Sequence, residues 1–142
     1  MTPFHIVLLA LVAPASTHFL LNNPTTIGFI DDIEGIGPCG GFSPNLSNDT
    51  ITTWHVGGDT IFTTLAHPQS NFLYRATLDV TASGNWTELF PIVSQTGLGD
   101  FCEPAVPAPM SWVGKKGILS VVADGPDGVL FQVGLPHAFQ TT

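Results

Sequence analysis

The sequence has 142 residues, of which 44% are hydrophobic and only 10% are charged, and its 3 Lys+Arg against 11 Asp+Glu give a formal net charge of −8. This length predicts one domain with a real core, and the apolar content is too high for a disordered chain. A nucleic-acid partner requires a basic face, and three cations cannot build one. We therefore expect no nucleic-acid partner.

Residues 1–17 have the pattern of a secretory signal peptide. The apolar run 6–12 (IVLLALV) is too short to span roughly 30 Å of hydrocarbon, which takes about 20 residues, and small residues follow it. Cleavage after Ala15 leaves Ser16 first, whereas cleavage after Thr17 leaves His18 first. Both positions fit, with Ala15 slightly favoured. We expect a secreted, extracellular protein without a transmembrane segment, and residues 134–142 lack the pattern of a lipid-anchor signal.

Three N-glycosylation sequons, at Asn45, Asn48 and Asn85, fit the same secretory route. In an oxidising compartment Cys39 and Cys102 would tend to pair. The bridge would close a loop of about sixty residues and stabilise the fold by on the order of 4 kcal/mol if unstrained. Two unpaired thiols are the alternative.

The part of the chain after residue 17 shows no sustained helical period, because Gly and Pro interrupt it at short intervals. Several runs are instead rich in β-branched and aromatic residues and predict strands. These runs are Thr60–Leu65, Phe72–Val80, Thr87–Val93, Ile118–Ala123 and Val129–Val133. Turn signals separate them at roughly 10-residue spacing, which is typical of a β-sandwich. Pro104–Pro109 is predicted to be a surface connection.

Four histidines follow the predicted signal peptide: His18, His55, His67 and His137. The sequence contains no His-x-x-x-His or Cys-x-x-Cys metal-binding motif and no glycine-rich phosphate-binding motif. It also lacks the Gly-x-Ser-x-Gly motif of serine hydrolases. His18 differs from the others because cleavage before it would offer two ligands, the α-amino nitrogen and Nδ1. A second imidazole would complete a planar three-nitrogen set that suits Cu(II), an arrangement called a histidine brace.

Carboxylates gather in two Gly-rich turns, at 31–34 and 124–127. The first turn carries Asp31, Asp32 and Glu34. In such turns carboxylates more often cap and solvate the chain than catalyse, so spacing alone predicts no acid–base pair here.

A family resemblance covers essentially the whole chain from His18 onward. The motifs are the opening run 18–29 (HFLLNNPTTIGF), then Asp31-Asp32, 38–42 (PCGGF), 66–68 (AHP), 99–104 (GDFCEP) and 121–132 (VVADGPDGVLFQ). In these motifs the sequence resembles the fungal secreted copper proteins that are similar to lytic polysaccharide monooxygenases and include copper acquisition factors. The resemblance favours cleavage after Thr17, which makes residues 18–142 the domain.

The resemblance implies an immunoglobulin-like β-sandwich that holds one copper ion. His18 matches the N-terminal ligand and His67 matches the second histidine. An aspartate takes the place that the monooxygenases give to an axial Tyr or Phe, and it matches Asp127, with Asp124 as the rival. His55 and His137 match no ligand.

Two departures from the family pattern affect these expectations. The last strand continues as Gln132-Val133, where family members usually have Gln-Cys, so the bridge made by that cysteine is missing. Many members also carry a C-terminal lipid-anchor signal, which is not seen here. These departures leave the pairing of Cys39 with Cys102 and the attachment of the protein to the cell surface open.

Two functions from different classes fit this reading. The first is a copper-binding protein for copper acquisition or homeostasis, with a cell-surface copper transporter as partner. The second is a copper-dependent lytic polysaccharide monooxygenase. The aspartate favours the first, because a carboxylate stabilises Cu(II) over Cu(I) and crowds the position that O₂ needs. The aromatic residues that could form a substrate surface do not cluster in sequence; they are Trp54, Trp86, Trp112 and Tyr74.

Overall fold

Two β-sheets account for the ordered core of residues 18–141, the part of the chain described in this computed structural model. The predicted signal peptide at 1–17 lies outside the described residues. The smaller sheet has the order β1-β3-β7. Its central strand, β3 (Asp59–Leu65), pairs antiparallel with β1 (Phe19–Asn23) and with β7 (Gly99–Val106).

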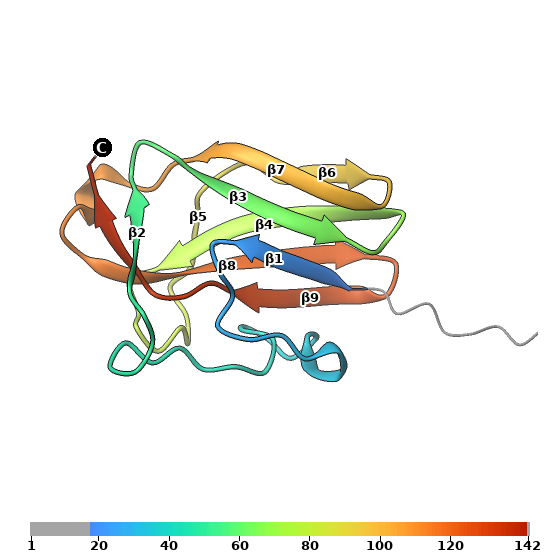
Figure 1. The fold of residues 1–142 in the computed structure, drawn as a ribbon, viewed down its shortest axis with the longest axis horizontal. Helices are drawn as coiled ribbons and strands as arrows, with labels where there is room; N and C mark the ends of the chain where they lie inside the picture. Colours follow the sequence, from blue (N-terminus) through green and yellow to red (C-terminus); the bar gives the residue numbers. More distant parts are fainter. Residues whose placement is uncertain (1–17, 142) are drawn as a thin grey trace, which may run out of the picture.

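The larger sheet faces the smaller one and is built around a long antiparallel pair of strands (Figure 1). Its two central strands are β4 (Gln69–Thr77) and β8 (Lys116–Gly125), which pair antiparallel. On the β8 side lie β9 (Gly128–Val133), β10 (His137–Gln140) and β2 (Thr52–His55), and on the β4 side lie β5 (Thr87–Glu88) and β6 (Val93–Thr96). Two 3-10 helices, η1 (Asp31–Ile33) and η2 (Met110–Trp112), complete the elements of residues 18–141.

The main core lies between the two sheets. Alternate residues of β4, including Phe72 and Tyr74, point into it and are fully buried. Phe19 of β1 meets Phe72 edge-to-face, with ring centroids 5.6 Å apart. Such alternation of buried and exposed positions is what one face of a pleated strand produces, so the inward-facing residues of both sheets form one apolar layer.

A second, smaller cluster covers the opposite face of the larger sheet. Cys39 packs there with Ile118 and Val133. The long segment between β1 and β2 runs along this face, below the sheet in Figure 1. The larger sheet therefore lies between this cluster and the smaller sheet.

The predicted β-sandwich is confirmed, with an all-β, immunoglobulin-like arrangement of two sheets. The predicted strands at 60–65, 118–123 and 129–133 lie within β3, β8 and β9. The predicted strand at 87–93 is divided into β5 and β6, and Pro91 lies between the two. Proline lacks the N–H that a strand ladder needs.

Two other expectations about strands were partly wrong. The strand predicted over 72–80 is β4, which begins earlier, at Gln69, and ends at Thr77. It ends there because Asp79 accepts hydrogen bonds from Thr81 and Ser83 and closes a turn. Pro104, predicted to lie in a surface connection, is part of β7. β7 is an edge strand, where proline is tolerated. Within residues 18–141 no helix is long and apolar enough to cross a membrane.

Candidate metal centre

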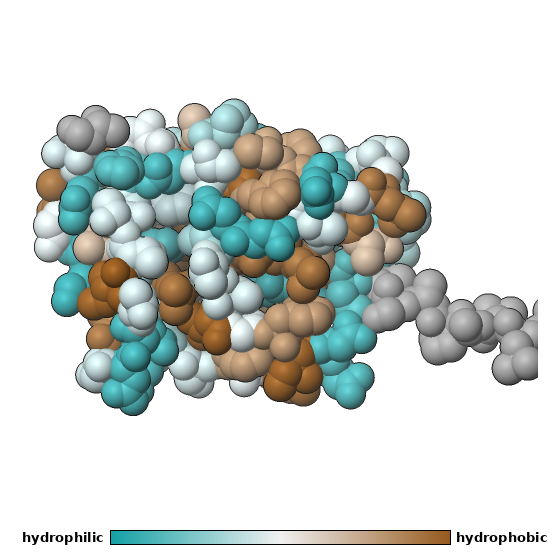
Figure 2. All heavy atoms as spheres, in the orientation of Figure 1, coloured by the Kyte–Doolittle hydropathy of each residue, from teal (hydrophilic) through white to brown (hydrophobic). Residues whose placement is uncertain are grey.

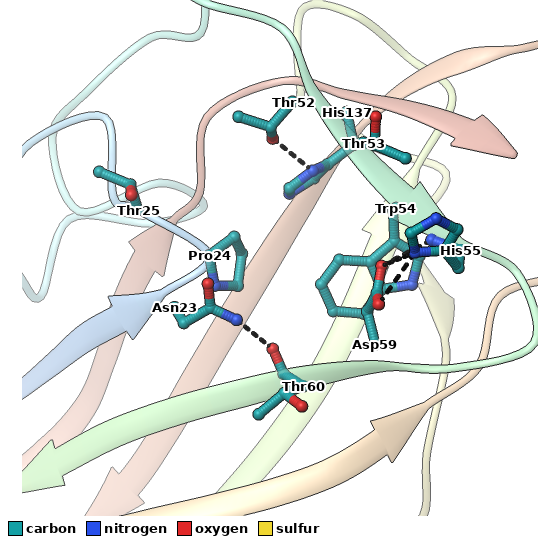
Figure 3. A pocket seen from close by; sticks show the side chains of 10 residues that line it. All are labelled: Asn23, Pro24, Thr25, Thr52, Thr53, Trp54, His55, Asp59, Thr60 and His137. Atoms are coloured by element: carbon teal, nitrogen blue, oxygen red, sulfur yellow. Dashed lines mark hydrogen bonds and ion pairs between the residues drawn. The ribbon is translucent and has the colours of Figure 1, made fainter. Parts of the chain in front are cut away.

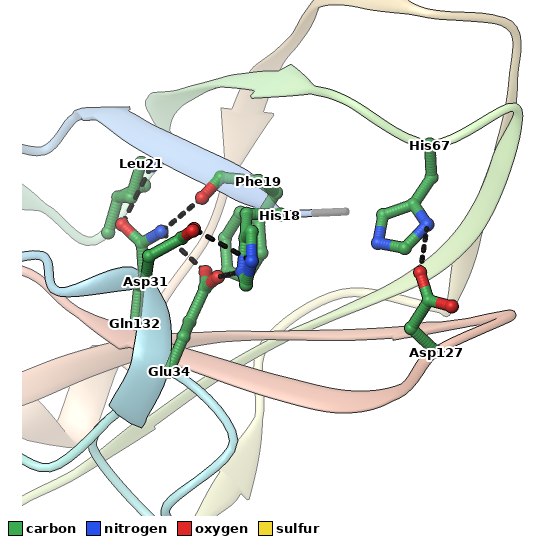
Figure 4. A network of polar contacts seen from close by, with 8 residues as sticks. All are labelled: His18, Phe19, Leu21, Asp31, Glu34, His67, Asp127 and Gln132. Atoms are coloured by element: carbon green, nitrogen blue, oxygen red, sulfur yellow. Dashed lines mark hydrogen bonds and ion pairs between the residues drawn. The ribbon is translucent and has the colours of Figure 1, made fainter. Parts of the chain in front are cut away.

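His67 and Asp127 meet at one end of the sandwich (Figure 4). His67 lies in the connection between β3 and β4, and Asp127 lies in the turn between β8 and β9. The two residues are far apart in the sequence, but β4 and β8 pair along their length and bring the two connections together. Asp127 Oδ2 lies 3.5 Å from His67 Nδ1.

The imidazole of His67 is 2% exposed, and neither ring nitrogen has a hydrogen-bond partner. The 3.5 Å separation from Asp127 is too long for a good hydrogen bond. A buried polar group usually has a partner, and leaving one without costs roughly 1–3 kcal/mol. Lone pairs that no protein group uses are what a metal ion requires from histidine. The donors here therefore fit a metal ion.

Gly125 lies close to this histidine. A Cβ added at Gly125 would lie 3.7 Å from His67 Nδ1, which is ordinary van der Waals contact. The β8–β9 hairpin therefore packs directly against the ring.

The imidazole ring of His18 contacts two other carboxylates. His18 Nδ1 lies 2.7 Å from Glu34 Oε2, and His18 Nε2 lies 2.7 Å from Asp31 Oδ1. Phe29 also contacts the ring edge-to-face, with centroids 6.3 Å apart. In Figure 4 the His18 ring points toward the segment that carries Asp31 and Glu34 and not toward His67.

Glu34 is a buried partner of His18 that spacing alone did not identify. Its side chain is 1% exposed, and its second oxygen accepts a hydrogen bond of 2.7 Å from Gln132 Nε2. Burial raises the pKa of the Glu34 carboxyl above its ordinary value, against the lowering effect of the hydrogen bonds from Gln132 and His18. Spacing could not have identified this pair, because Glu34 and Gln132 are far apart in the chain.

Gln132 extends this contact to the backbone of β1. Its Nε2 also donates to the Phe19 carbonyl, and its Oε1 accepts a 2.9 Å hydrogen bond from the Leu21 N–H. One buried amide from β9 thus satisfies the open edge of β1 and the Glu34 carboxylate together. The strand that begins next to His18 is held in place by this network.

The structure brings together two of the three predicted ligands. His67 and Asp127 are adjacent, whereas His18 lies with Asp31 and Glu34. Over residues 18–141 no group of three or more His, Cys, Asp or Glu side chains is placed to hold a metal ion. Asp124, the rival for the third ligand, has an exposed side chain, and its carbonyl accepts a hydrogen bond from Ser70.

The other two histidines of residues 18–141, His55 and His137, lie at the other end of the sandwich. His55 pairs with Asp59, with its Nδ1 3.0 Å from Asp59 Oδ2. His137 is buried beside Thr52. Neither lies beside His67, and that neither is a copper ligand stays a prediction.

The predicted disulfide between Cys39 and Cys102 is absent, and both are free thiols. Cys39 is buried under the segment that covers the larger sheet, whereas Cys102 is exposed on β7 of the smaller sheet. The larger sheet separates them, so their side chains cannot meet without rearranging the fold. The oxidising environment favours pairing only for thiols that the fold brings together. The three sequon asparagines are all exposed: Asn45, Asn48 and Asn85.

The fold is an all-β sandwich of two sheets, and at one end a buried histidine that makes no hydrogen bond lies beside an aspartate. A family model described as "Copper acquisition factor BIM1-like" matches residues 16–133. The chain therefore belongs to the BIM1-like copper acquisition factor family, and its function is related to copper. A search of the curated proteins found no match.

Proposed function

We propose that the protein is secreted and binds one Cu(II) ion as cargo through a histidine brace, for copper acquisition or homeostasis. In this proposal the ligands are the α-amine and imidazole of His18 and the imidazole of His67, with Asp127 as the acidic group. The family match supports copper as the metal. The residues of this chain supply the rest of the argument.

The observation that carries the proposal is the state of His67. Its two buried ring nitrogens have no partner, and a carboxylate lies 3.5 Å away. A neutral imidazole next to a carboxylate is a donor set that divalent transition metals bind well. The lone pair that the protein leaves unused on one ring nitrogen of His67 is the one that copper would take.

His18 must change its partners for a brace to form. In the uncleaved chain its nitrogen is an amide linked to Thr17, so it is not an amine. Cleavage after Thr17 would create the amine, and Nδ1 would then have to leave Glu34, which lies 2.7 Å away. The signal-peptide cut and the rearrangement of this one ring are the two steps that the proposal requires.

Asp127 supports holding copper over oxygen chemistry. A carboxylate adds a negative charge that favours Cu(II) over Cu(I), and a monooxygenase must pass through Cu(I). We therefore propose that the protein does not cleave polysaccharides. A cell-surface copper transporter is the partner that this cargo function would serve.

Copper titration of the protein that begins at His18 tests the proposal. We expect one Cu(II) per chain, and His67→Ala to weaken the Kd at least about 100-fold, because a ligand is lost. One residue added before His18 should weaken binding similarly, because the amine is then an amide. His55→Ala is the matched control and should bind like the wild type. Unchanged affinity in both altered proteins would overturn the brace.

A further inference from the structure

Among residues 18–141, Glu34 is the only carboxylate that is buried. It directly follows the short helix η1, and its side chain is 1% exposed. Moving a carboxylate out of water costs several kcal/mol unless its partners compensate. The partners of Glu34 therefore indicate what this carboxylate is placed to do.

Both oxygens of Glu34 have a partner. Oε2 lies 2.7 Å from His18 Nδ1, and Oε1 accepts a 2.7 Å hydrogen bond from Gln132 Nε2. The same Gln132 amide is bonded to the Phe19 carbonyl and the Leu21 N–H of β1. The carboxylate is therefore held by a buried amide, which is itself fixed to the strand that begins next to His18.

Asp31 is the second carboxylate on the His18 ring, and it lies in a different environment. Its Oδ1 is 2.7 Å from His18 Nε2, but its side chain is 49% exposed. The face shown in Figure 2 carries hydrophilic side chains beside the start of β1. Water can replace a contact of this kind, so it contributes little. Of the two carboxylates, Glu34 is the one that solvent cannot replace.

The pair of His55 and Asp59 shows what a surface contact of this type looks like (Figure 3). These residues are four apart in the sequence, and their side chains are 38% and 31% exposed. Such a pair forms locally and requires no burial of charge. The contact between His18 and Glu34 spans sixteen residues and requires a carboxylate beneath the surface, so it needs an explanation beyond surface pairing.

A histidine that binds a metal through one ring nitrogen usually donates its other ring N–H to a carboxylate or carbonyl, which fixes the ring. His67 makes no hydrogen bond and is held by burial alone. His18 would be the first residue of the cleaved chain, and chain termini are poorly ordered unless they are tied down. In a histidine brace, His18 is thus the ligand that most needs such a partner.

The geometry of the imidazole allows Glu34 to serve this purpose. His18 Nδ1 now faces Glu34 (Figure 4). Cε1 is bonded to both ring nitrogens, so it lies between the contacts with Glu34 and Asp31. The second side-chain torsion of histidine has two broad, roughly equivalent states. A half-turn moves Nδ1 away from Glu34 and puts Nε2 in the place of Cε1, where its N–H can reach the carboxylate.

We propose that Glu34 is a positioning residue of the copper centre, whose buried carboxylate accepts the Nε2–H of His18 and fixes the ring that binds copper through Nδ1. This inference rests on the proposed histidine brace. Glu34 acts through His18 and does not touch the metal. Gln132 contributes by holding the carboxylate in place.

Copper titration of Glu34→Gln, in the protein that begins at His18, tests the inference. Glutamine keeps the side-chain volume, and its oxygen can still accept from Gln132, so the buried network stays closed. We expect the Kd for Cu(II) to weaken at least about tenfold. Asp32→Asn is the matched control, because it removes the same charge from an exposed position on η1, and it should change the Kd by less than about threefold. Urea unfolding of both variants checks that they fold.

Pulsed EPR of the copper-loaded proteins gives a readout that a merely structural role would not change. The quadrupole coupling of an imidazole nitrogen remote from copper depends on the group to which its N–H donates. In the wild type, the remote nitrogens of His18 and His67 should give different couplings. Glu34→Gln should shift one of them and leave the other unchanged.

An unchanged or tighter Kd in Glu34→Gln would overturn the inference, as would equal remote-nitrogen couplings in the wild type. A larger loss in Asp31→Asn than in Glu34→Gln would assign the role to Asp31 instead. If His67→Ala weakens copper binding and Glu34→Gln does not, the brace stands and this inference alone fails. If neither variant weakens it, both fail.

Discussion

His67 and Asp127 are held 3.5 Å apart by two different connections, one between β3 and β4 and the other between β8 and β9. Neither residue has another partner that would explain this placement in residues 18–141: His67 makes no hydrogen bond, and the Asp127 side chain is half-exposed. The pairing of β4 with β8 fixes the distance. In the proposed function, these two residues supply half of the copper centre.

Asp127→Asn is expected to raise the Cu(II)/Cu(I) potential by on the order of 100 mV, because it removes a negative charge beside the metal while keeping the side-chain volume. Spectroelectrochemistry of the copper-loaded protein measures this shift. Asp124→Asn is the matched control, since it removes the same charge from the same hairpin. A shift in the Asp124 variant alone would move the acidic ligand to Asp124.

The copper-loaded protein with a reductant and peroxide is expected to release no oxidised oligosaccharides from cellulose, chitin or xylan. The physical reason is that the carboxylate stabilises the oxidised metal. Mass spectrometry of the soluble fraction measures the products. Oxidised products that require copper would favour the monooxygenase function instead.

Gln132→Leu is expected to destabilise the protein by about 3 kcal/mol or more. The substitution leaves Glu34 Oε1 and the Leu21 N–H without a hydrogen-bond partner, while Glu34 Oε2 keeps its contact with His18. Each buried group that loses its partner costs roughly 1–3 kcal/mol. Urea unfolding measures the change in the free energy of unfolding. Gln69→Leu, at an exposed position, is the control and should change it by less than about 0.5 kcal/mol. Equal effects in both variants would show that the network contributes nothing.

The stability of the protein is expected to fall as the pH drops from about 6.5 to about 4, through His137. Its pKa is lowered from 6.5 to about 4 in the folded state, chiefly by burial. Between these values the unfolded chain binds a proton that the folded chain does not, so acid favours unfolding by up to about 1.4 kcal/mol per pH unit.

The measurement is the difference in the free energy of unfolding between wild type and His137→Phe across that pH range. Taking the difference cancels the contributions of other groups, including Glu34, whose raised pKa acts in the opposite direction. A difference that stays constant with pH would contradict the assignment to His137.

Both cysteines are expected to be free and to differ in reactivity. Cys102 is exposed and should be alkylated by iodoacetamide in the native protein. Cys39 is buried, and burial raises the pKa of its thiol, so it should react only after unfolding. Intact-mass analysis without a reductant counts the labels. Unlabelled denatured protein would restore the predicted disulfide.

The sequence by itself determined the class of fold. Runs such as Ile118–Ala123 and Val129–Val133, bounded by Gly and Pro, become β8 and β9 because β-branched residues suit a pleated, half-buried surface. Strand ends were less predictable where a side chain decides them: Asp79 closes the turn after β4, and Pro91 lies between β5 and β6. The motif residues His67 and Asp127 were also identified from sequence, through the family resemblance.

Only the tertiary structure decided which of those residues meet. The Glu34–Gln132 contact joins positions that no local pattern relates, and it depends on how the segment after β1 lies against β9. The separation of Cys39 from Cys102 follows from which face of the larger sheet each side chain occupies. The sequence determines the spacing of apolar residues along each strand. Contacts between distant elements depend on how the two sheets and the segment between β1 and β2 pack together.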